Sequence, residues 1–317
     1  ARDSDNFEVR GPGILLGDFQ PNLGPVAIMD GRLRPTLQFA NCRQALLRDL
    51  LILDSQAWTT VLVACEAIDL ANHKVVSCAI SDDGIDVVGS KKITIRDSFV
   101  SSRDDCIAVK ASDYQPFLAV DGAHDVEEVR VEGCVFANAD CGNALEIGFE
   151  LKTDSVRDIR FEDCDILRSE TEGNRSGAAM SVHCGNWAHV SDVCFKDIRV
   201  EQAMEKLIDV GIFHSPYDRD TRRGRIDDIR FEGIRLMAGV LPRIFVEGCD
   251  PEHSVRNVRF DDFRMGAPLY RSVLNRNFGL PPSLPPWPER PLDRTLGEIL
   301  VSEHASDLRI NGRTVVG

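Results

Sequence analysis

The chain has 317 residues, 43% of them hydrophobic, so it is long enough to bury a large core. Its formal net charge of −14 argues against a nucleic-acid partner, because phosphate binding needs clustered lysine and arginine. No stretch approaches the ~18 consecutive apolar residues of a membrane span. We therefore expect neither nucleic acid nor membrane as a partner.

Short strand patterns run along the chain from its first third onward. In each triplet of the first set the outer residues are apolar: Leu37-Gln38-Phe39, Val61-Leu62-Val63, Ile85-Asp86-Val87, Ile107-Ala108-Val109, Leu145-Glu146-Ile147, Met180-Ser181-Val182 and Ile208-Asp209-Val210. Such alternation, rich in β-branched residues, predicts strands. The outer residues would point into a core, and the middle ones would point outward.

A second set of strand triplets alternates with the first at intervals of 29–36 residues. Its members are Ile93-Thr94-Ile95, Val129-Arg130-Val131, Ile159-Arg160-Phe161, Val193-Cys194-Phe195, Ile229-Arg230-Phe231 and Val258-Arg259-Phe260. Recurrence at this period is typical of repeat architectures. Because no convincing amphipathic helix separates the strands, we predict an all-β fold, a right-handed parallel β-helix, over residues 1–267.

The two ends of the chain lack this pattern. Residues 268–317 follow the repeats and contain six prolines between Leu280 and Pro291, which predicts an irregular tail packed on the solenoid. At the other end no cap is evident, although solenoids need capped ends. We expect either a small cap or further native residues before Ala1.

Ten cysteines are spread along the chain without a CxxC pair or a metal-ligand spacing. Most of them stand at apolar strand or turn positions, which is typical of buried, reduced thiols. This pattern mildly favours a reducing compartment but is also compatible with export, so the localisation stays open.

Acidic residues gather where two of the predicted strands begin. Ser81-Asp82-Asp83-Gly84-Ile85 returns 22 residues later as Arg103-Asp104-Asp105-Cys106-Ile107. In a parallel solenoid, equivalent residues of neighbouring coils lie about 4.8 Å apart. The predicted outward column then reads Gln38, Leu62, Asp86, Ala108, Glu146, Ser181 and Asp209. One face of the solenoid would therefore carry acids and face solvent.

Four acids within two coils repel one another, so at least one pKa should rise. A protonated carboxyl beside an ionised one is what acid/base cleavage of a glycosidic bond requires. Asp82-Asp83-Gly84 alone could be a simple turn, since Asp and Gly favour turns. Asp104-Asp105-Cys106 lacks the glycine, and the equal register of the two motifs favours catalysis.

These two motifs resemble the Asn-Thr-Asp-Gly and Gly-Asp-Asp motifs of the polygalacturonase family, the family 28 glycoside hydrolases. The similarity extends over roughly Arg34 to Met265. The resemblance implies a right-handed β-helix that hydrolyses with inversion and needs no metal or organic cofactor. It assigns the general acid to Asp104, and the pair that activates the water to Asp83 and Asp105.

The sequence departs from the family at three positions. Asn143 stands where the histidine of the family's Gly-His-Gly motif is expected, and Glu146 replaces the serine of Ser-Ile-Gly. The Arg-Ile-Lys motif, which grips a uronate carboxylate, falls on Ser181-Val182-His183. An acidic site lacking these cations would repel polygalacturonate. Lys110 and Arg103 could partly compensate, so the exclusion is incomplete.

The remaining candidates are substrate-binding residues on the same face: Asp86, Lys110, Asn143, Glu146, His183 and Trp58. Trp58 could stack on a sugar ring or simply pack in the core. Glu146 could bind sugar hydroxyls or join a proton relay. For His183 the two alternatives are a place in the site and a purely structural role.

The sequence thus predicts an inverting glycoside hydrolase that acts on an oligosaccharide or polysaccharide other than plain polygalacturonate. Two alternatives stay open, a polysaccharide lyase or epimerase on the same fold and a non-catalytic carbohydrate-binding solenoid. A lyase or epimerase would need a cation near the uronate, which the missing motif disfavours. Sugar identity, endo or exo action and oligomeric state are not encoded in these motifs.

Overall fold

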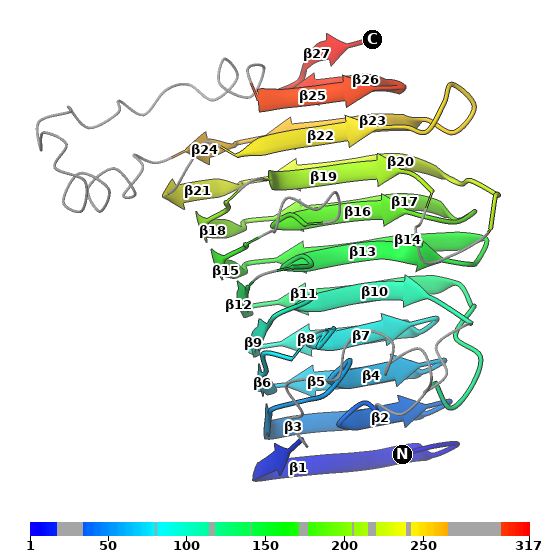
Figure 1. Cartoon of the computed structure of the whole chain (residues 1–317), viewed down its shortest axis with the longest axis vertical. Helices are drawn as coiled ribbons and strands as arrows, with labels where there is room; N and C mark the ends of the chain where they lie inside the picture. The colour runs from blue at the N-terminus through cyan, green and yellow to red at the C-terminus, as the bar shows by residue number, and fades with distance from the viewer. Residues whose placement is uncertain are drawn as a thin grey trace, which may run out of the picture.

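The protein is a right-handed parallel β-helix, as the sequence predicts (Figure 1). The computed structural model describes residues 1–17, 34–79, 81–113, 118–139, 141–170, 177–204, 206–214, 220–238, 242–265 and 299–317. Figure 1 shows the coils stacked from the blue N-terminal strand at the bottom to the red C-terminal strands at the top. Within the described residues, no helix is long and apolar enough to cross a membrane.

The described strands form two sheets, which we name sheet A and sheet B. Sheet A, which faces the viewer in Figure 1, contains β2 (Leu37–Ala40), β4 (Thr60–Val63), β7 (Ile85–Val88), β10 (Ile107–Ala111), β13 (Leu145–Leu151), β16 (Met180–Cys184), β19 (Lys206–Ile212), β22 (Arg243–Glu247) and β25 (Leu300–Glu303). Its neighbouring strands pair in parallel, so each coil adds one strand to this sheet.

Sheet B supplies the other sides of each coil. It contains β1 (Asp5–Leu16), β3 (Arg43–Leu53), β5 (Glu66–Ala71), β6 (Lys74–Val76), β8 (Lys91–Arg96), β9 (Phe99–Ser102), β11 (Val126–Glu132), β12 (Val135–Asn138), β14 (Ser155–Glu162), β15 (Asp165–Arg168), β17 (His189–Lys196), β18 (Arg199–Gln202), β20 (Arg225–Glu232), β21 (Arg235–Ala238), β23 (Val255–Asp261), β24 (Arg264–Met265), β26 (Ala305–Ile310) and β27 (Arg313–Val316). The predicted second set of triplets lies in this sheet and in the predicted register.

The core is a set of columns in which equivalent residues of successive coils stack. Phe161, Phe195, Phe231 and Phe260 stack with ring centroids 4.8, 4.9 and 5.3 Å apart and ring planes within 10° of parallel. Offset stacking at this spacing adds to the burial of each ring. Because the spacing between coils matches the stacking distance of aromatic rings, phenylalanine can recur at the same position of successive coils.

The turn between the two sheet B strands of a coil repeats with equal regularity. One residue there has a positive φ of 46–67° in each of seven coils: Asn72, Asp97, Gly133, Asp163, Asp197, Gly233 and Asp262. Asn, Asp and Gly are the residues that adopt this left-handed conformation at least cost. The sequence therefore specifies the bend of each coil locally.

The register of the first coils corrects one predicted position. Val61, not Leu62, pairs with Gln38 and Asp86, so Leu62 points into the main core. The last three residues of β4, Val61–Val63, are all apolar, so no alternation indicates the direction of their side chains. Val61 instead joins a smaller apolar cluster with Trp58 and Val88. The outward residue of successive coils is thus Gln38, then the apolar Val61, then Asp86.

The prediction that residues 268–317 form an irregular tail is wrong for their last part. β25 pairs in parallel with β22, and β26 pairs in parallel with β23, so both sheets continue beyond residue 298. β27 then folds back antiparallel on β26. The Pro-rich stretch of the predicted tail lies outside the described residues.

Candidate active site

The repeated acidic motifs lie at the N-terminal ends of β7 and β10, as the sequence predicts. Backbone hydrogen bonds continue the sheet A pairing into these turns, because Gly84 N donates to Asp105 O at 2.7 Å and Cys106 N donates to Asn143 O at 2.9 Å. Gly84 is required here, since a Cβ would lie 2.2 Å from a Val100 methyl group. Asp83, Asp105 and Asn143 are therefore neighbours on three successive coils.

Three carboxyl groups converge at this point. One oxygen from each of Asp83, Asp104 and Asp105 lies within 4.8 Å of the other two. Asp83 and Asp105 are buried, whereas Asp104 is partly exposed. Burial and mutual repulsion raise the pKa of Asp83 and of Asp105 well above the ordinary range, and burial also raises the pKa of Asp104.

The carboxylate oxygens of Asp83, Asp104 and Asp105 lie closer together than the acid and base of an inverting hydrolase. Inverting hydrolases place acid and base about 6.5–9.5 Å apart to leave room for a water molecule. The nearest oxygens of Asp104 and Asp83 lie within 4.8 Å of each other and so do not reach this separation. The same three oxygens are also spaced closely enough to hold a cation. The ammonium group of Lys110, which contacts Asp83, already supplies positive charge there.

Asp82 differs from its counterpart Asp104, although the two precede equivalent residues. Its carboxylate accepts hydrogen bonds from the backbone N–H groups of Ala79, Arg103 and Asp104, at 3.0, 2.9 and 3.2 Å. Burial raises the pKa of Asp82 to about 7 despite these donors. Asp82 therefore fixes the backbone that carries Asp104 rather than joining the three converging carboxyls.

Lys110 is buried among acids. Its Nζ contacts the carboxylate of Asp83, lies 3.1 Å from Asp86 Oδ1, and sits 3.8 Å from the ring centroid of Trp58. All four side chains are less than about a twentieth exposed. Burial lowers the Lys110 pKa, but Asp83 and Asp86 outweigh it and raise that pKa well above its usual value. The structure thus uses Lys110, Asp86 and Trp58 to support Asp83.

Asn143 supports the other base candidate. Its backbone N–H and its Nδ2 both donate to Asp105 Oδ1, each at 2.8 Å. Its own Oδ1 accepts from Ser181 Oγ at 2.5 Å and from Ala178 N at 2.9 Å. All the hydrogen-bonding groups of the Asn143 side chain are thereby oriented. Asn143 positions Asp105, and Ser181 positions Asn143.

Glu146 and His183 form a second buried charge group beside the acids. His183 Nδ1 lies 3.0 Å from Glu146 Oε1, and its Nε2 lies 3.4 Å from Asp209 Oδ2. Lys206 Nζ lies 2.6 Å from the same Asp209 oxygen. Asp209 stood in the predicted column, but neither it nor Lys206 was among the predicted site residues. Only the register, which brings Asp209 beside Ser181, could have pointed to it.

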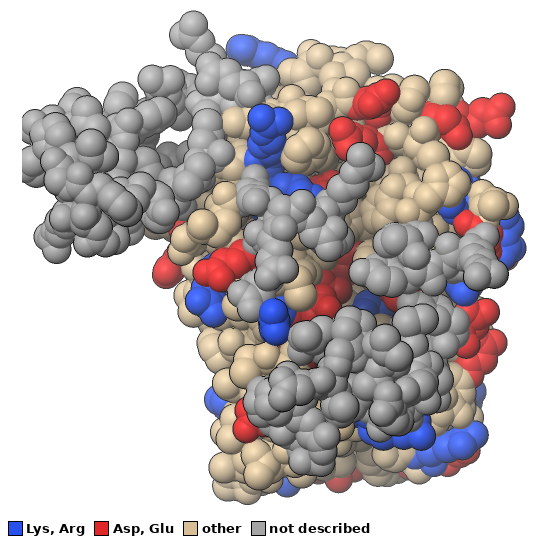
Figure 2. Space-filling model, in the orientation of Figure 1, with Lys and Arg blue, Asp and Glu red and all other residues tan. Residues whose placement is uncertain are grey.

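The predicted polar column is correct in register from Asp86 onward, but the prediction that it faces solvent is wrong. Asp86, Glu146, Ser181 and His183 are fully buried. Pairing across coils with Lys110, Asn143 and one another offsets the cost of burying them. Figure 2 shows acidic and basic side chains next to each other on this face, about midway up the stack.

The fold is thus a parallel β-helix. Its candidate active site is formed by three carboxyl groups that converge at adjacent coils of sheet A. The sequence model of the family described as glycosyl hydrolases family 28 matches residues 4–266. The chain belongs to this family, as the motifs predicted.

The relatives and solved structures similar to this chain carry related descriptions. A probable polygalacturonase of Arabidopsis thaliana is 23% identical over 233 residues, 71% of this chain and 48% of that protein. An exopolygalacturonase of Platanus acerifolia is 24% identical over 256 residues, covering 73% and 59%. The crystal structure of a hyperthermoactive exopolygalacturonase from Thermotoga maritima has the same fold, with a TM-score of 0.62, 15% identity and coverage of 87% and 55%. The chain spans about half the length of the relatives it matches.

Proposed function

We propose that the chain hydrolyses glycosidic bonds of an oligosaccharide or polysaccharide with inversion, and that its substrate is not plain polygalacturonate. The observation that carries the proposal is the convergence of Asp83, Asp104 and Asp105. Three buried or half-buried carboxyls this close cannot all be ionised, so the group retains at least one proton at neutral pH. It can therefore supply both the acid and the base that the reaction needs.

Their surroundings divide the roles among the three carboxyls. Lys110 favours the ionised form of Asp83, and two N–H groups of Asn143 favour that of Asp105. Burial nevertheless leaves the pKa of both carboxyls raised further than that of Asp104, so the acid is assigned to Asp104 by its exposure and its place in the motif. Asp104, the partly exposed member, receives one backbone N–H, from Asp105 at 3.0 Å. Asp104 would protonate the leaving oxygen while Asp83 and Asp105 deprotonate the attacking water. Inversion requires Asp104 to turn away from them when substrate enters.

The substrate assignment follows from the charges beside the acids. The positions expected for the family's uronate-binding cations carry Ser181 and His183. His183 is held between two carboxylates, and Lys110 likewise contacts two. Cations already neutralised in this way offer little attraction to the carboxylate of a galacturonate unit. A sugar without that carboxylate suits the site better.

The test is a panel of neutral and acidic oligosaccharides assayed with the wild-type protein and with Asp104→Asn. We expect hydrolysis of a neutral member, products of inverted anomeric configuration by proton NMR, and loss of turnover with retained binding in Asp104→Asn. Asp69→Asn, on the outer face of sheet B, is the control and should keep full activity. An ultraviolet-absorbing unsaturated product would instead indicate a lyase, and binding of a glycan without turnover would indicate a binding protein.

A further inference from the structure

Glu146, His183 and Asp209 come from three successive strands of sheet A, β13, β16 and β19. The imidazole of His183 lies between the two carboxylates, 3.0 Å from one and 3.4 Å from the other. Glu146 and His183 are fully buried, and Asp209 nearly so. We name this assembly the histidine clamp.

The backbone around the histidine clamp is shaped to fit it. At Gly148, which has a φ of +129°, a Cβ would lie 2.0 Å from His183 O and 2.9 Å from Glu146 Oε1. Only glycine therefore allows the Glu146 carboxylate to approach the imidazole. The ring of Phe213 meets the imidazole edge-on, with centroids 5.3 Å apart. These contacts leave the imidazole one orientation.

The charges of the histidine clamp are balanced internally. Burial lowers the pKa of His183, but Glu146 and Asp209 outweigh it and raise that pKa to about 10. The imidazole is therefore a cation at neutral pH. Lys206, paired with Asp209, supplies the second positive charge. Two cations thus offset two carboxylates, and Lys110 adds a further attraction toward Glu146, but burial outweighs these cations and raises the pKa of Glu146.

One oxygen of the histidine clamp is left over. Glu146 Oε1 is hydrogen-bonded to His183 Nδ1, whereas Glu146 Oε2 is buried and has no hydrogen-bond partner among the described residues. Glu146 stands in the outward column directly beside Ala108, and its charge raises the pKa of Asp105. A buried carboxylate oxygen without a donor is costly. A hydroxyl group of a bound sugar is a donor of the right kind.

We infer that Glu146 is a specificity-determining residue, which accepts a hydrogen bond from a hydroxyl of a neutral sugar and repels a uronate at the same position. The inference rests on the proposed function, since it places this contact next to the reacting bond. A hydroxyl can donate to Glu146 Oε2, whereas the carboxylate of a uronate would bring a second negative charge against it. The identity of the sugar ring is not part of the inference.

The first experiment measures the charge of His183 without any substrate. Long-range proton–nitrogen NMR on the labelled protein reports whether one or both ring nitrogens are protonated, with assignment by loss of signals in His183→Gln. We expect both nitrogens of His183 to carry protons at neutral pH. The equally buried His73 is the internal control, because burial lowers its pKa to about 4 and it should be neutral. A neutral His183 would overturn the charge balance of the histidine clamp, whereas the role of Glu146 is decided by the second experiment.

The second experiment compares affinities. In the inactive Asp104→Asn background, binding of neutral oligosaccharides and of tri-galacturonate is measured before and after Glu146→Gln, which keeps the shape and removes the charge. We expect the preference for the neutral ligand over tri-galacturonate to fall by about tenfold, roughly one pKa unit of interaction. Asp227→Asn is the matched control, because it alters the partly buried His189–Asp227 pair on sheet B.

The outcomes separate the two claims. Binding with an unchanged preference in Glu146→Gln would overturn the specificity role and leave the proposed hydrolysis standing. Binding of no oligosaccharide at all would overturn both. If Glu146→Gln fails to fold, judged by circular dichroism, Glu146→Ser replaces it, because serine is the residue expected there from the family motif.

Discussion

At the scale of single residues, the site is built from side chains that hold one another across neighbouring coils. Asn143 and Ser181 illustrate this, because they occupy the two positions where the family motifs predict a histidine and an arginine. They contact each other at 2.5 Å, and Asn143 in turn donates to Asp105. The two departures from the family pattern are therefore one connected change, and its effect is on the orientation and charge of Asp105.

Asn143→Ala should lower kcat by about 10- to 100-fold, the effect of losing a hydrogen bond to a charged group. The acid limb of the pH–rate profile should move to higher pH, because the ionised form of Asp105 loses the Nδ2 donor. Ser181→Ala should give a shift in the same direction but a smaller one, since Ala178 N still holds the Asn143 amide.

The control for both variants is Ser98→Ala. The Ser98 hydroxyl makes comparable hydrogen bonds, to Arg96 O and from His73 N, in a turn of sheet B away from the acids. Ser98→Ala should lower the stability of the fold and leave the pH–rate profile unshifted. An unshifted profile in Asn143→Ala would show that Asn143 does not set the charge of Asp105.

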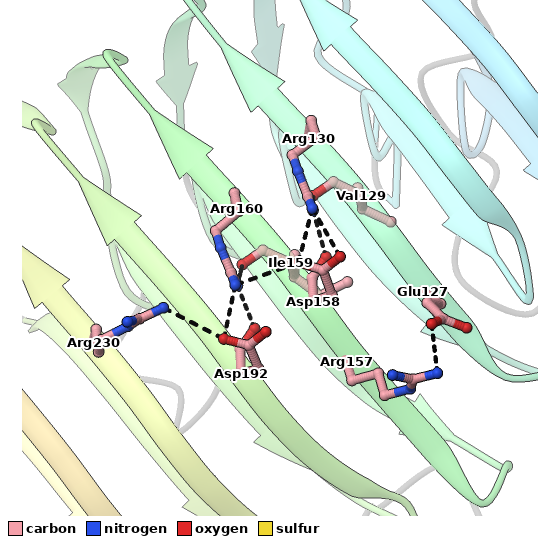
Figure 3. Close-up of polar contacts among 9 residues, drawn as sticks. All are labelled: Glu127, Val129, Arg130, Arg157, Asp158, Ile159, Arg160, Asp192 and Arg230. Carbon is pink, nitrogen blue, oxygen red and sulfur yellow. Dashed lines mark hydrogen bonds and ion pairs between the residues drawn. The ribbon is translucent and has the colours of Figure 1, made fainter.

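At the scale of strands, each residue's neighbours on adjacent coils decide what it contributes. Along β14, Phe161 stacks inward on Phe195, and the adjacent Arg160 lies outward. Figure 3 shows the outward residues alternating in charge across neighbouring strands, with Arg160 between Asp158 and Asp192. One face of β14 packs in the core, and the other carries partly exposed ion pairs.

Phe161→Ala should destabilise the protein by about 3–5 kcal/mol, because it removes one ring from a closed stack and leaves a cavity. Arg160→Ala should cost about 1 kcal/mol or less, since water already screens its ion pairs. The measurement is the shift in the midpoint of urea unfolding, with the two adjacent substitutions compared directly. Equal shifts would mean that the charged row in Figure 3 contributes as much as the core.

Sequence reasoning worked where side-chain alternation was strict. The recurrent Ile-Arg-Phe pattern gives the direction of each residue, so Phe161 and its equivalents were placed correctly. In β4 the three residues after Thr60 are all apolar, and Leu62 was assigned to the wrong face. The acids at residues 82–105 could be located because residues at equivalent positions of a sequence repeat lie next to each other on neighbouring coils. The burial of Lys110 could not, because its partners Asp83 and Asp86 lie 27 and 24 positions away and pair with it only across the coil.

At the scale of the whole molecule, the buried ionisable groups make the stability of the fold depend on pH. His183 is the clearest case above neutrality, because its pKa in the folded protein is about 10 against an ordinary value of 6.5. Below pH 6.5 the histidine is charged in both the folded and the unfolded chain, so its full contribution to stability is present. As the pH rises toward 10, only the folded state still binds the proton, and the contribution is lost progressively.

The wild-type protein should therefore lose stability as the pH rises from 6.5 to about 10, with a slope of up to about 1.4 kcal/mol per pH unit from this one residue. His183→Gln should be less stable than the wild type at pH 6.5 but should lose much less over the same range, so that the two curves converge. The matched control is His73→Gln. Its burial lowers the pKa to about 4, so above about pH 7.5 the histidine is neutral whether the chain is folded or not, and from there the curve should run parallel to that of the wild type. Urea unfolding at a series of pH values measures all three slopes. Parallel curves for the wild type and His183→Gln would mean that the imidazole between Glu146 and Asp209 does not carry the charge that the geometry assigns to it.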